Sequence, residues 1–230
     1  MTQTYLHALA PLGGFNDQPH LSGAPGGNLD LTAPAMILDG SLLGRTVTGP
    51  RQLGSPGGLA ALSLNFLAQK RIDVGTTPFF INHSPTPPAI RIIPGATGST
   101  AGVPEFVLSG GEPLPLPPAL KQSLALGASL LDEEDGFGRL SLDNREGSVS
   151  IAGPAPLRLQ PGGGLRVDAA GISLATGISA PGGSVTLTAN NYSPFLLNEL
   201  TLLGLWGNGP APDPLPGRGA VSLSRSAWID

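Results

Sequence analysis

Between Gly147 and Ala189 the chain alternates apolar and polar residues in short groups, each with two apolar positions, separated by glycine and proline. A period of two places the apolar side chains on one face of a strand. Strands this short are unstable alone and need neighbours on which to stack. The side chains expected to point inward are Val149, Ile151, Leu157, Leu159, Leu165, Val167, Ile172, Leu174, Ile178, Val185 and Leu187.

This pattern recurs along the chain. The motif Gly-x-apolar-x-apolar begins at Gly147 and Gly183, and a shorter form, Gly-apolar-x-apolar, begins at Gly164. The spacing of roughly 17 to 20 residues is typical of one coil of a β-solenoid. An earlier copy, Gly27–Ala33, is close in sequence to Gly183–Ala189. Each coil would turn through about three short strands and lie about 4.8 Å from the next. A β-sandwich is the competing fold, but it would show longer alternation at intervals of 8 to 12 residues.

Residues 72–118 differ from the rest because prolines crowd this stretch. Three strand-like islands stand in it, Phe79–Ile81, Ala89–Ile93 and Phe106–Leu108. Proline lacks the N–H that a ladder needs, so we expect these islands to be edge strands or excursions from the coil.

A short helix is predicted after this stretch, because Leu120, Leu124 and Leu131 fall on one face at helical spacing. The apolar segment from Phe195 to Trp206 is expected to form one or two longer strands, and Val221–Leu223 a final strand. The predicted organisation is therefore coils over 1–71, a Pro-rich excursion over 72–118, a short helix with an acidic loop over 119–136, and coils over 137–230.

Composition supports short strands over helices. The chain of 230 residues contains 34 glycines and 25 prolines, which leaves few uninterrupted runs long enough for a helical enzyme domain. So much glycine and proline also suits a disordered chain. An apolar share of 40% argues against disorder, except in 72–118, where the disordered alternative stays open.

Charge and residue content exclude several classes of protein. The net charge is −4 and charged residues are only 12%, so no basic stripe is available to bind nucleic acid. No apolar run is long enough for a membrane-spanning helix, and cysteine is absent, which removes disulfides and thiolate sites. The first residues lack the basic and apolar regions of an export signal.

No metal or cofactor site is predicted. The acidic run Asp132–Asp135 could bind Ca²⁺, but a solvated loop is the simpler interpretation. In Gly26–Leu31, Leu29 stands where the calcium nonapeptide needs its third glycine. His7, His20 and His83 have no zinc-site spacing.

No catalytic residue is predicted either. The chain has neither a nucleophile elbow nor a phosphate-binding loop. The carboxylates that a polysaccharide-degrading enzyme would bring together in one groove are sparse, and each sits beside a glycine or a strand end, which suggests turns. They are Asp39, Asp73, Asp143, Glu146 and Asp168. Ser173, Thr186 and Thr188 would form hydroxyl ladders on the outer face, which could present a flat surface to a glycan or to ice, or be only the polar outer face of a solenoid.

Two strings, Gly171–Ala189 and Gly26–Gly40, resemble the repeats of bacterial filamentous haemagglutinin-type large exoproteins, and Leu38–Arg51 is similar to a stretch within long members of that group. The resemblance implies a right-handed parallel β-helix, export by two-partner secretion through an outer-membrane transporter, and a role in adhesion. The sequence lacks the signal peptide and amino-terminal secretion domain of a complete member, so we interpret it as an internal fragment of a longer surface protein.

The leading hypothesis is a non-enzymatic rod segment at the bacterial cell surface or outside the cell, which presents binding elements to a host or bacterial receptor or glycan. The excursion over 72–118 would carry the specificity, since binding loops accumulate on irregular insertions. Two alternatives stay open: a β-helical polysaccharide-degrading enzyme, and the stalk of a contact-dependent toxin-delivery protein.

Overall fold

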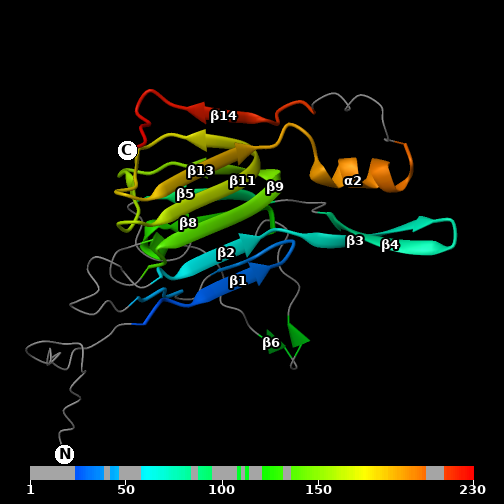
Figure 1. The fold of residues 1–230 in the computed structure, drawn as a ribbon, viewed down its shortest axis with the longest axis horizontal. Helices are drawn as coiled ribbons and strands as arrows, with labels where there is room; N and C mark the ends of the chain where they lie inside the picture. The colour runs from blue at the N-terminus through cyan, green and yellow to red at the C-terminus, as the bar shows by residue number, and fades with distance from the viewer. Residues whose placement is uncertain are drawn as a thin grey trace, which may run out of the picture.

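The computed structural model describes residues 24–38, 42–46, 58–83, 88–94, 108–109, 112–113, 121–131, 136–205 and 215–230. The fold consists mostly of strands, arranged as a curled parallel sheet (Figure 1). One limb of this sheet contains five parallel strands in the order β1-β2-β9-β11-β13. Their bounds are β1 Asn28–Thr32, β2 Ala61–Asn65, β9 Arg139–Ile151, β11 Gly164–Leu174 and β13 Ser184–Ala189.

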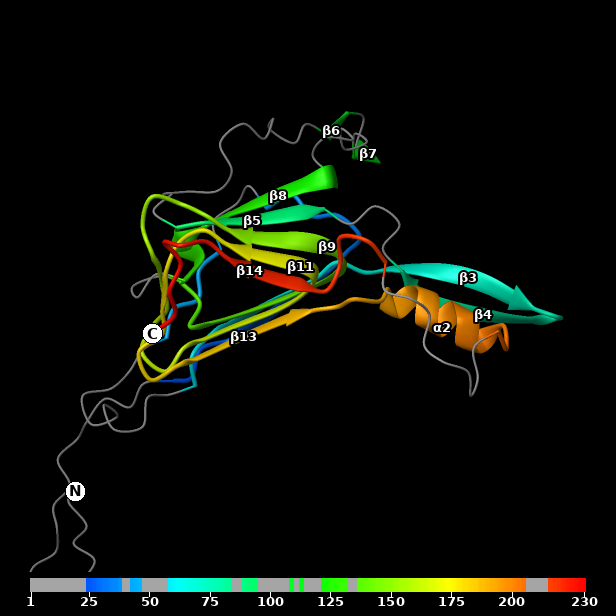
Figure 2. The same cartoon turned by 90° about the horizontal axis from the view of Figure 1, so that it is seen from above.

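The two longest strands, β9 and β11, bend and continue into a second limb. Their later halves pair with each other, and the register shifts between Ala169 and Gly171. On either side of them lie β5 (Ala89–Ile93), paired with β9, and β14 (Ala220–Leu223), paired with β11. Both limbs therefore share the same two strands, and the sheet curls around one interior (Figure 2).

Further strands complete the described part of the chain. A third, short parallel pair joins β10 (Leu157–Arg158) to β12 (Ile178–Ser179), and Ile178 also bridges to Ile229. Two antiparallel hairpins lie outside the sheet. They are β3 (Ala68–Val74) with β4 (Thr77–His83), and β6 (Leu108–Ser109) with β7 (Glu112–Pro113).

Asn144 and Gly147 shape the bend of β9. The Asn144 side chain is fully buried, and its Nδ2 donates to the Pro88 carbonyl at 2.8 Å. A Cβ at position 147 would lie 2.6 Å from that Nδ2, so only glycine fits beside it. The bend thus joins β9 to the residue just before β5.

The interior consists of aliphatic side chains at every second position of the strands. Nine of the eleven predicted inward residues are buried, and Val185 and Leu187 on the edge strand β13 are partly buried. In the first limb Leu64, Leu142 and Val167 are fully buried. Because Leu64 lies opposite Leu142 and Leu142 opposite Val167, these side chains stack in a row across the strands.

The spacing of the repeat is longer and less regular than predicted. Ser184 lies opposite Gly164, which fits the predicted interval, but Gly164 lies opposite Arg139, which is further back along the chain than that interval allows. The alignment of Val149 with Leu165 is wrong, since Val149 lies opposite Ile172 in the second limb. The motif alone does not distinguish a strand of one limb from a strand of the other.

The predicted helix over 119–131 is wrong for most of its described length. Only residues 121 and 122 are helical, and they are followed by β8 (Ser123–Gly127) and a 3₁₀ turn, Ala128–Leu131. In β8, Leu124 and Leu126 are buried and alternate with Ser123 and Ala125. The buried positions therefore follow the period of two of a strand and not the helical period that was predicted. Pairing with β5 supplies the neighbour that selects the strand.

The strands predicted from Phe195 onward are also wrong, because Pro194–Leu202 forms the helix α2. Its start has local signals: the Ser193 hydroxyl accepts a hydrogen bond from the Leu196 N–H at 3.1 Å, and proline occupies the first turn. Such a cap favours a helix even in an apolar segment.

The island Ala89–Ile93 is not an edge strand. It forms β5, which lies between β8 and β9, and its Ile90 and Ile92 are each only 1% exposed. Proline flanks this strand but does not interrupt it, so every ladder donor is kept. The excursion predicted over 72–118 thus contains an interior strand, and the chain has already left the sheet at Ala68.

The strand order in the second limb does not follow the chain. β8 comes after β5 in sequence but pairs with it on the side away from β9. The chain therefore steps back past β5 before it forms β9. In the described part of the chain no helix is long and apolar enough to cross a membrane.

We expect Leu142→Ala to lower the free energy of unfolding by about 2–5 kcal/mol, because it leaves a cavity in the row of buried side chains. Leu223→Ala is a matched control, since Leu223 is 53% exposed on β14, and its effect should be about 0.5 kcal/mol or less. Urea denaturation of both variants measures the difference. Equal losses would contradict the assignment of Leu142 to the core.

Candidate functional site

The β3–β4 hairpin projects beyond the end of the sheet and forms the first part of the candidate site (Figure 1). Its strands join through a turn in which Gly75 has a φ of 63°, a conformation that favours glycine. Ile72 lies opposite Phe79 and is buried, at 8% exposed. Phe80, on the other face of the hairpin, is 63% exposed.

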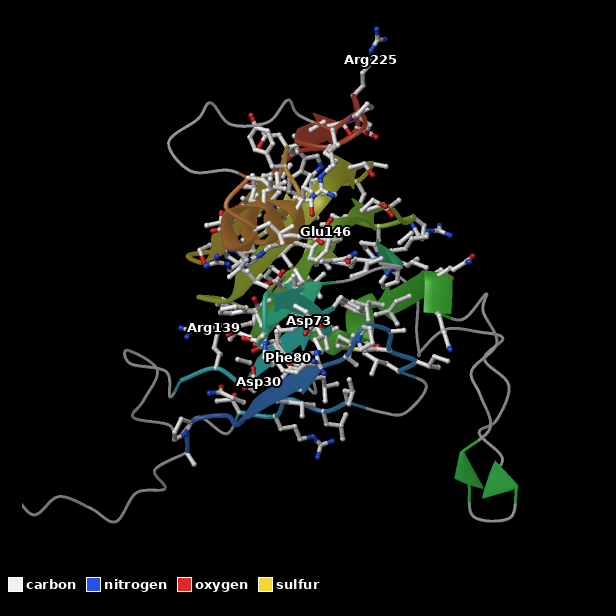
Figure 3. The ribbon with its side chains drawn as sticks, turned by 90° about the vertical axis from the view of Figure 1, so that its right-hand side faces the viewer. Asp30, Asp73, Phe80, Arg139, Glu146 and Arg225 are labelled. Carbon is white, nitrogen blue, oxygen red and sulfur yellow. The ribbon has the colours of Figure 1, made fainter. Side chains whose placement is uncertain are left out.

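The open face of the hairpin combines this aromatic ring with two charges. Arg71 lies opposite Phe80, and its Nε donates to Asp73 Oδ1 at 2.9 Å. Both charged side chains are about 60% exposed. Asp73 and Phe80 lie on the hairpin that points toward the viewer in Figure 3. The face thus offers an exposed aromatic group beside an ion pair.

Helix α2 forms the second part, although it lies far from the hairpin in the sequence. It runs alongside β4 (Figure 2). Leu203 and Leu205, just after its last turn, are 41% and 72% exposed. We call β3, β4 and residues 194–205 together the outgrowth; it exposes large apolar side chains from two distant segments.

Arg218 attaches the helical part of the outgrowth to the sheet. Its Nη1 donates to Glu146 Oε2 at 3.0 Å, and its other nitrogens donate to the carbonyls of Arg145, Asn190 and Tyr192. The other Glu146 oxygen, Oε1, accepts from the Ser193 hydroxyl at 2.7 Å. Ser193 is also the helix cap, so one carboxylate on β9 holds both the start of α2 and the approach to β14.

Two carboxylates lie side by side on the outer face of the first limb. Asp143 on β9 is directly opposite Asp168 on β11. Each has an arginine partner at 3.0 Å, Arg145 for Asp143 and Arg166 for Asp168. Asp143 Oδ1 is buried without a hydrogen-bond partner. Burial raises the pKa of Asp143 above its ordinary value; Arg145 opposes this shift and Asp168 adds to it.

A shallow groove of about 480 Å³ lies on the same outer face, toward the start of the strands. Its polar lining comes from neighbouring strands of the first limb. These residues are Ser63, Arg139, Ser141, Arg166, Ser184 and Thr186. The groove ends at a corner of glycines, where Gly162 and Gly182 have φ values of 72° and 62°. These glycines are needed for the turn, as expected for corner residues.

Some of the carboxylates that are far apart in the sequence lie close together in the structure. Asp143, Glu146 and Asp168 lie near the bend of β9 and β11, whereas Asp73 lies on the hairpin. Asp39, His7, His20 and Asp132–Asp135 lie outside the described residues.

The remaining sequence candidates occupy ordinary positions in strands and turns. Ser173, Thr186 and Thr188 are exposed on the outer faces of their strands, as predicted. Gly26 packs against Ala60, where a Cβ would lie 2.4 Å from the Ala60 nitrogen, so close packing explains this glycine. Among the described residues no three His, Cys, Asp or Glu side chains group as metal ligands would.

Comparison with known proteins finds no matching family model, and neither curated proteins nor solved structures show significant similarity to this chain. The resemblance to filamentous haemagglutinin-type exoproteins therefore stays a prediction from the residues.

We expect Arg218→Ala to lower the free energy of unfolding by roughly 3 kcal/mol, because it leaves the enclosed Glu146 carboxylate without its cation. Hydrogen exchange in residues 193–203 should become faster as α2 detaches. Arg71→Ala is the control, since its ion pair is exposed and should contribute about 0–1 kcal/mol. If the two variants lose equal stability, Arg218 does not attach the outgrowth.

The raised pKa of Asp143 predicts the direction in which stability changes with pH. The folded state holds this proton more tightly than the unfolded state, so the contribution of Asp143 to stability falls as pH rises from 3.8 through the raised pKa. Asp143→Asn removes that loss. The unfolding free energy of this variant relative to wild type should increase over that window, as measured by urea denaturation between pH 3.5 and 7. A constant difference would contradict the shift.

Proposed function

We propose that the chain is a structural and adhesive rod segment of a secreted or surface-anchored bacterial exoprotein, folded as a right-handed parallel β-helix. Its mechanism is presentation: a stiff stack of strands holds binding elements at a distance from the cell. In this proposal the parent chain leaves the cell through an outer-membrane transporter of the two-partner type. The partner is a receptor or glycan on a host or bacterial surface, and the segment has no catalytic activity.

The strand pairing supports the part of the proposal that concerns the fold, a parallel β-helix. All pairs within the curled sheet are parallel, and parallel neighbours require a crossover between them. From β9 to β13 the chain passes twice through the first limb, the second limb and the short β10–β12 pair in turn, and it then returns to the first limb at β13. Repeated passage around one interior is how a β-helix is built.

The outgrowth is the observation that carries the adhesive part. Two segments far apart in sequence leave the sheet, meet each other and return to it, while β9 and β11 pair along both limbs. They expose Phe80, Leu203 and Leu205. Exposed aromatic and aliphatic groups on a projection from a rigid scaffold are typical of recognition sites.

We expect Phe80→Ala to weaken attachment to cells at least tenfold, because exposed aromatic anchors dominate binding at such sites. The measurement is saturation binding of the labelled full chain to a panel of epithelial and bacterial cells. Leu223→Ala, which removes an exposed apolar side chain from the sheet instead, should bind like wild type. Absence of saturable binding to every cell type, or equal binding by Phe80→Ala, would overturn the adhesive role.

A polysaccharide-degrading enzyme is the second candidate, and the Asp143–Asp168 pair favours it. Glycoside hydrolysis uses two carboxylates, one of them with a raised pKa. Burial gives Asp143 that property, and Asp168 lies directly opposite it. However, both carboxylates are held by arginines, and neither lines the groove. We therefore place the enzyme second.

A further inference from the structure

The groove on the outer face of the first limb has a charge opposite to that of the whole protein. The chain has a net charge of −4, yet Arg139 and Arg166 line the groove and no carboxylate does. Its volume of about 480 Å³ falls within the range of roughly 300–1,000 Å³ that ligand sites occupy. The groove is therefore suited in size and charge to an anionic ligand.

The two arginines differ in how they are held. Arg166 Nε donates to Asp168 Oδ2 at 3.0 Å, which orients the guanidinium, while its side chain stays 63% exposed. Arg139 forms no ion pair within the described part of the chain, and Figure 3 shows it pointing outward from the sheet. Since Arg139 lies opposite Gly164, no side chain on the next strand covers it. An exposed, unpaired guanidinium can bind a carboxylate through two parallel hydrogen bonds.

Hydroxyl groups fill the remaining polar positions of the groove. Ser63 and Ser141 lie opposite each other, and Thr186 lies opposite Arg166 on the far side. Adjacent strands are about 4.8 Å apart, so donors and acceptors recur at short, regular intervals across the floor. A hydroxyl both donates and accepts, as the hydroxyl groups of a sugar do, so the two can pair in either direction.

We propose that this groove binds a uronate-containing oligosaccharide. Arg139 and Arg166 would pair with its carboxylates, and the serine and threonine hydroxyls would hydrogen-bond its sugar hydroxyls. The inference rests on the proposed adhesive function and names a ligand for it at a second surface, separate from the outgrowth.

The test is calorimetric titration of the full chain with short oligogalacturonides. Saturable binding should weaken at least tenfold in Arg139→Gln and further in Arg139→Glu, and it should weaken with salt because the attraction is between charges. Arg225→Gln is the matched control: Arg225 lies far from Arg139 in Figure 3 and should leave binding unchanged. Circular dichroism checks that each variant folds.

Several results would overturn the proposal. Equal binding by Arg139→Gln, or equal affinity for neutral oligosaccharides of the same length, would exclude recognition of the carboxylates. Equal affinity for oligoglutamate would show that charge alone is recognised and that the sugar assignment is wrong. New reducing ends released from the oligogalacturonides would make the groove a substrate site instead.

The two proposals fail separately. If Phe80-dependent attachment to cells persists while oligogalacturonides do not bind, only the groove proposal is lost. If oligogalacturonides bind through Arg139 but no cell type binds the chain, the adhesive role is lost and the groove remains.

Discussion

The fold depends on the rows of aliphatic side chains that cross β9 and β11. These two strands belong to both limbs, so their register fixes the interior of each: Leu142 against Val167 in one limb, and Ile151 against Leu174 in the other. A slip of one residue would turn every inward side chain outward in both limbs. The groove, the carboxylate pair and the attachment of α2 all lie on positions that this register sets.

The inward residues could be predicted because a period of two is visible in the sequence and depends only on which face is buried. The limb to which each strand belongs could not. Gly147–Ile151 and Gly164–Val167 have the same pattern, but one follows the bend and the other precedes it. For β8 the run of leucines fits both helical and strand periods, and only its pairing with β5 selects the strand. For α2, the sequence did contain a local signal for the start of a helix, the capping residue Ser193 followed by Pro194.

The candidate functional residues were harder to predict than the strands, because the pairing of distant strands brings them together. Asp143 and Asp168 are well separated in the sequence, and each looks like a turn residue until β9 and β11 are placed side by side. The contact between Arg218 and Glu146 spans 72 residues, and nothing near either residue in sequence indicates it. The hairpin was foreseen only as an excursion, because proline content predicts departure from a sheet but not the shape of what departs.

The backward step of the chain at β8 determines the order in which this molecule can assemble. If strands joined the stack in the order of synthesis, each would cover the free edge left by the one before it. Here β5 needs two neighbours from later in the chain, and they arrive on opposite edges, β8 on one and β9 on the other. The interior around Ile90 and Ile92 therefore closes only after residue 151 has emerged, and folding cannot proceed as a simple addition of layers from one end.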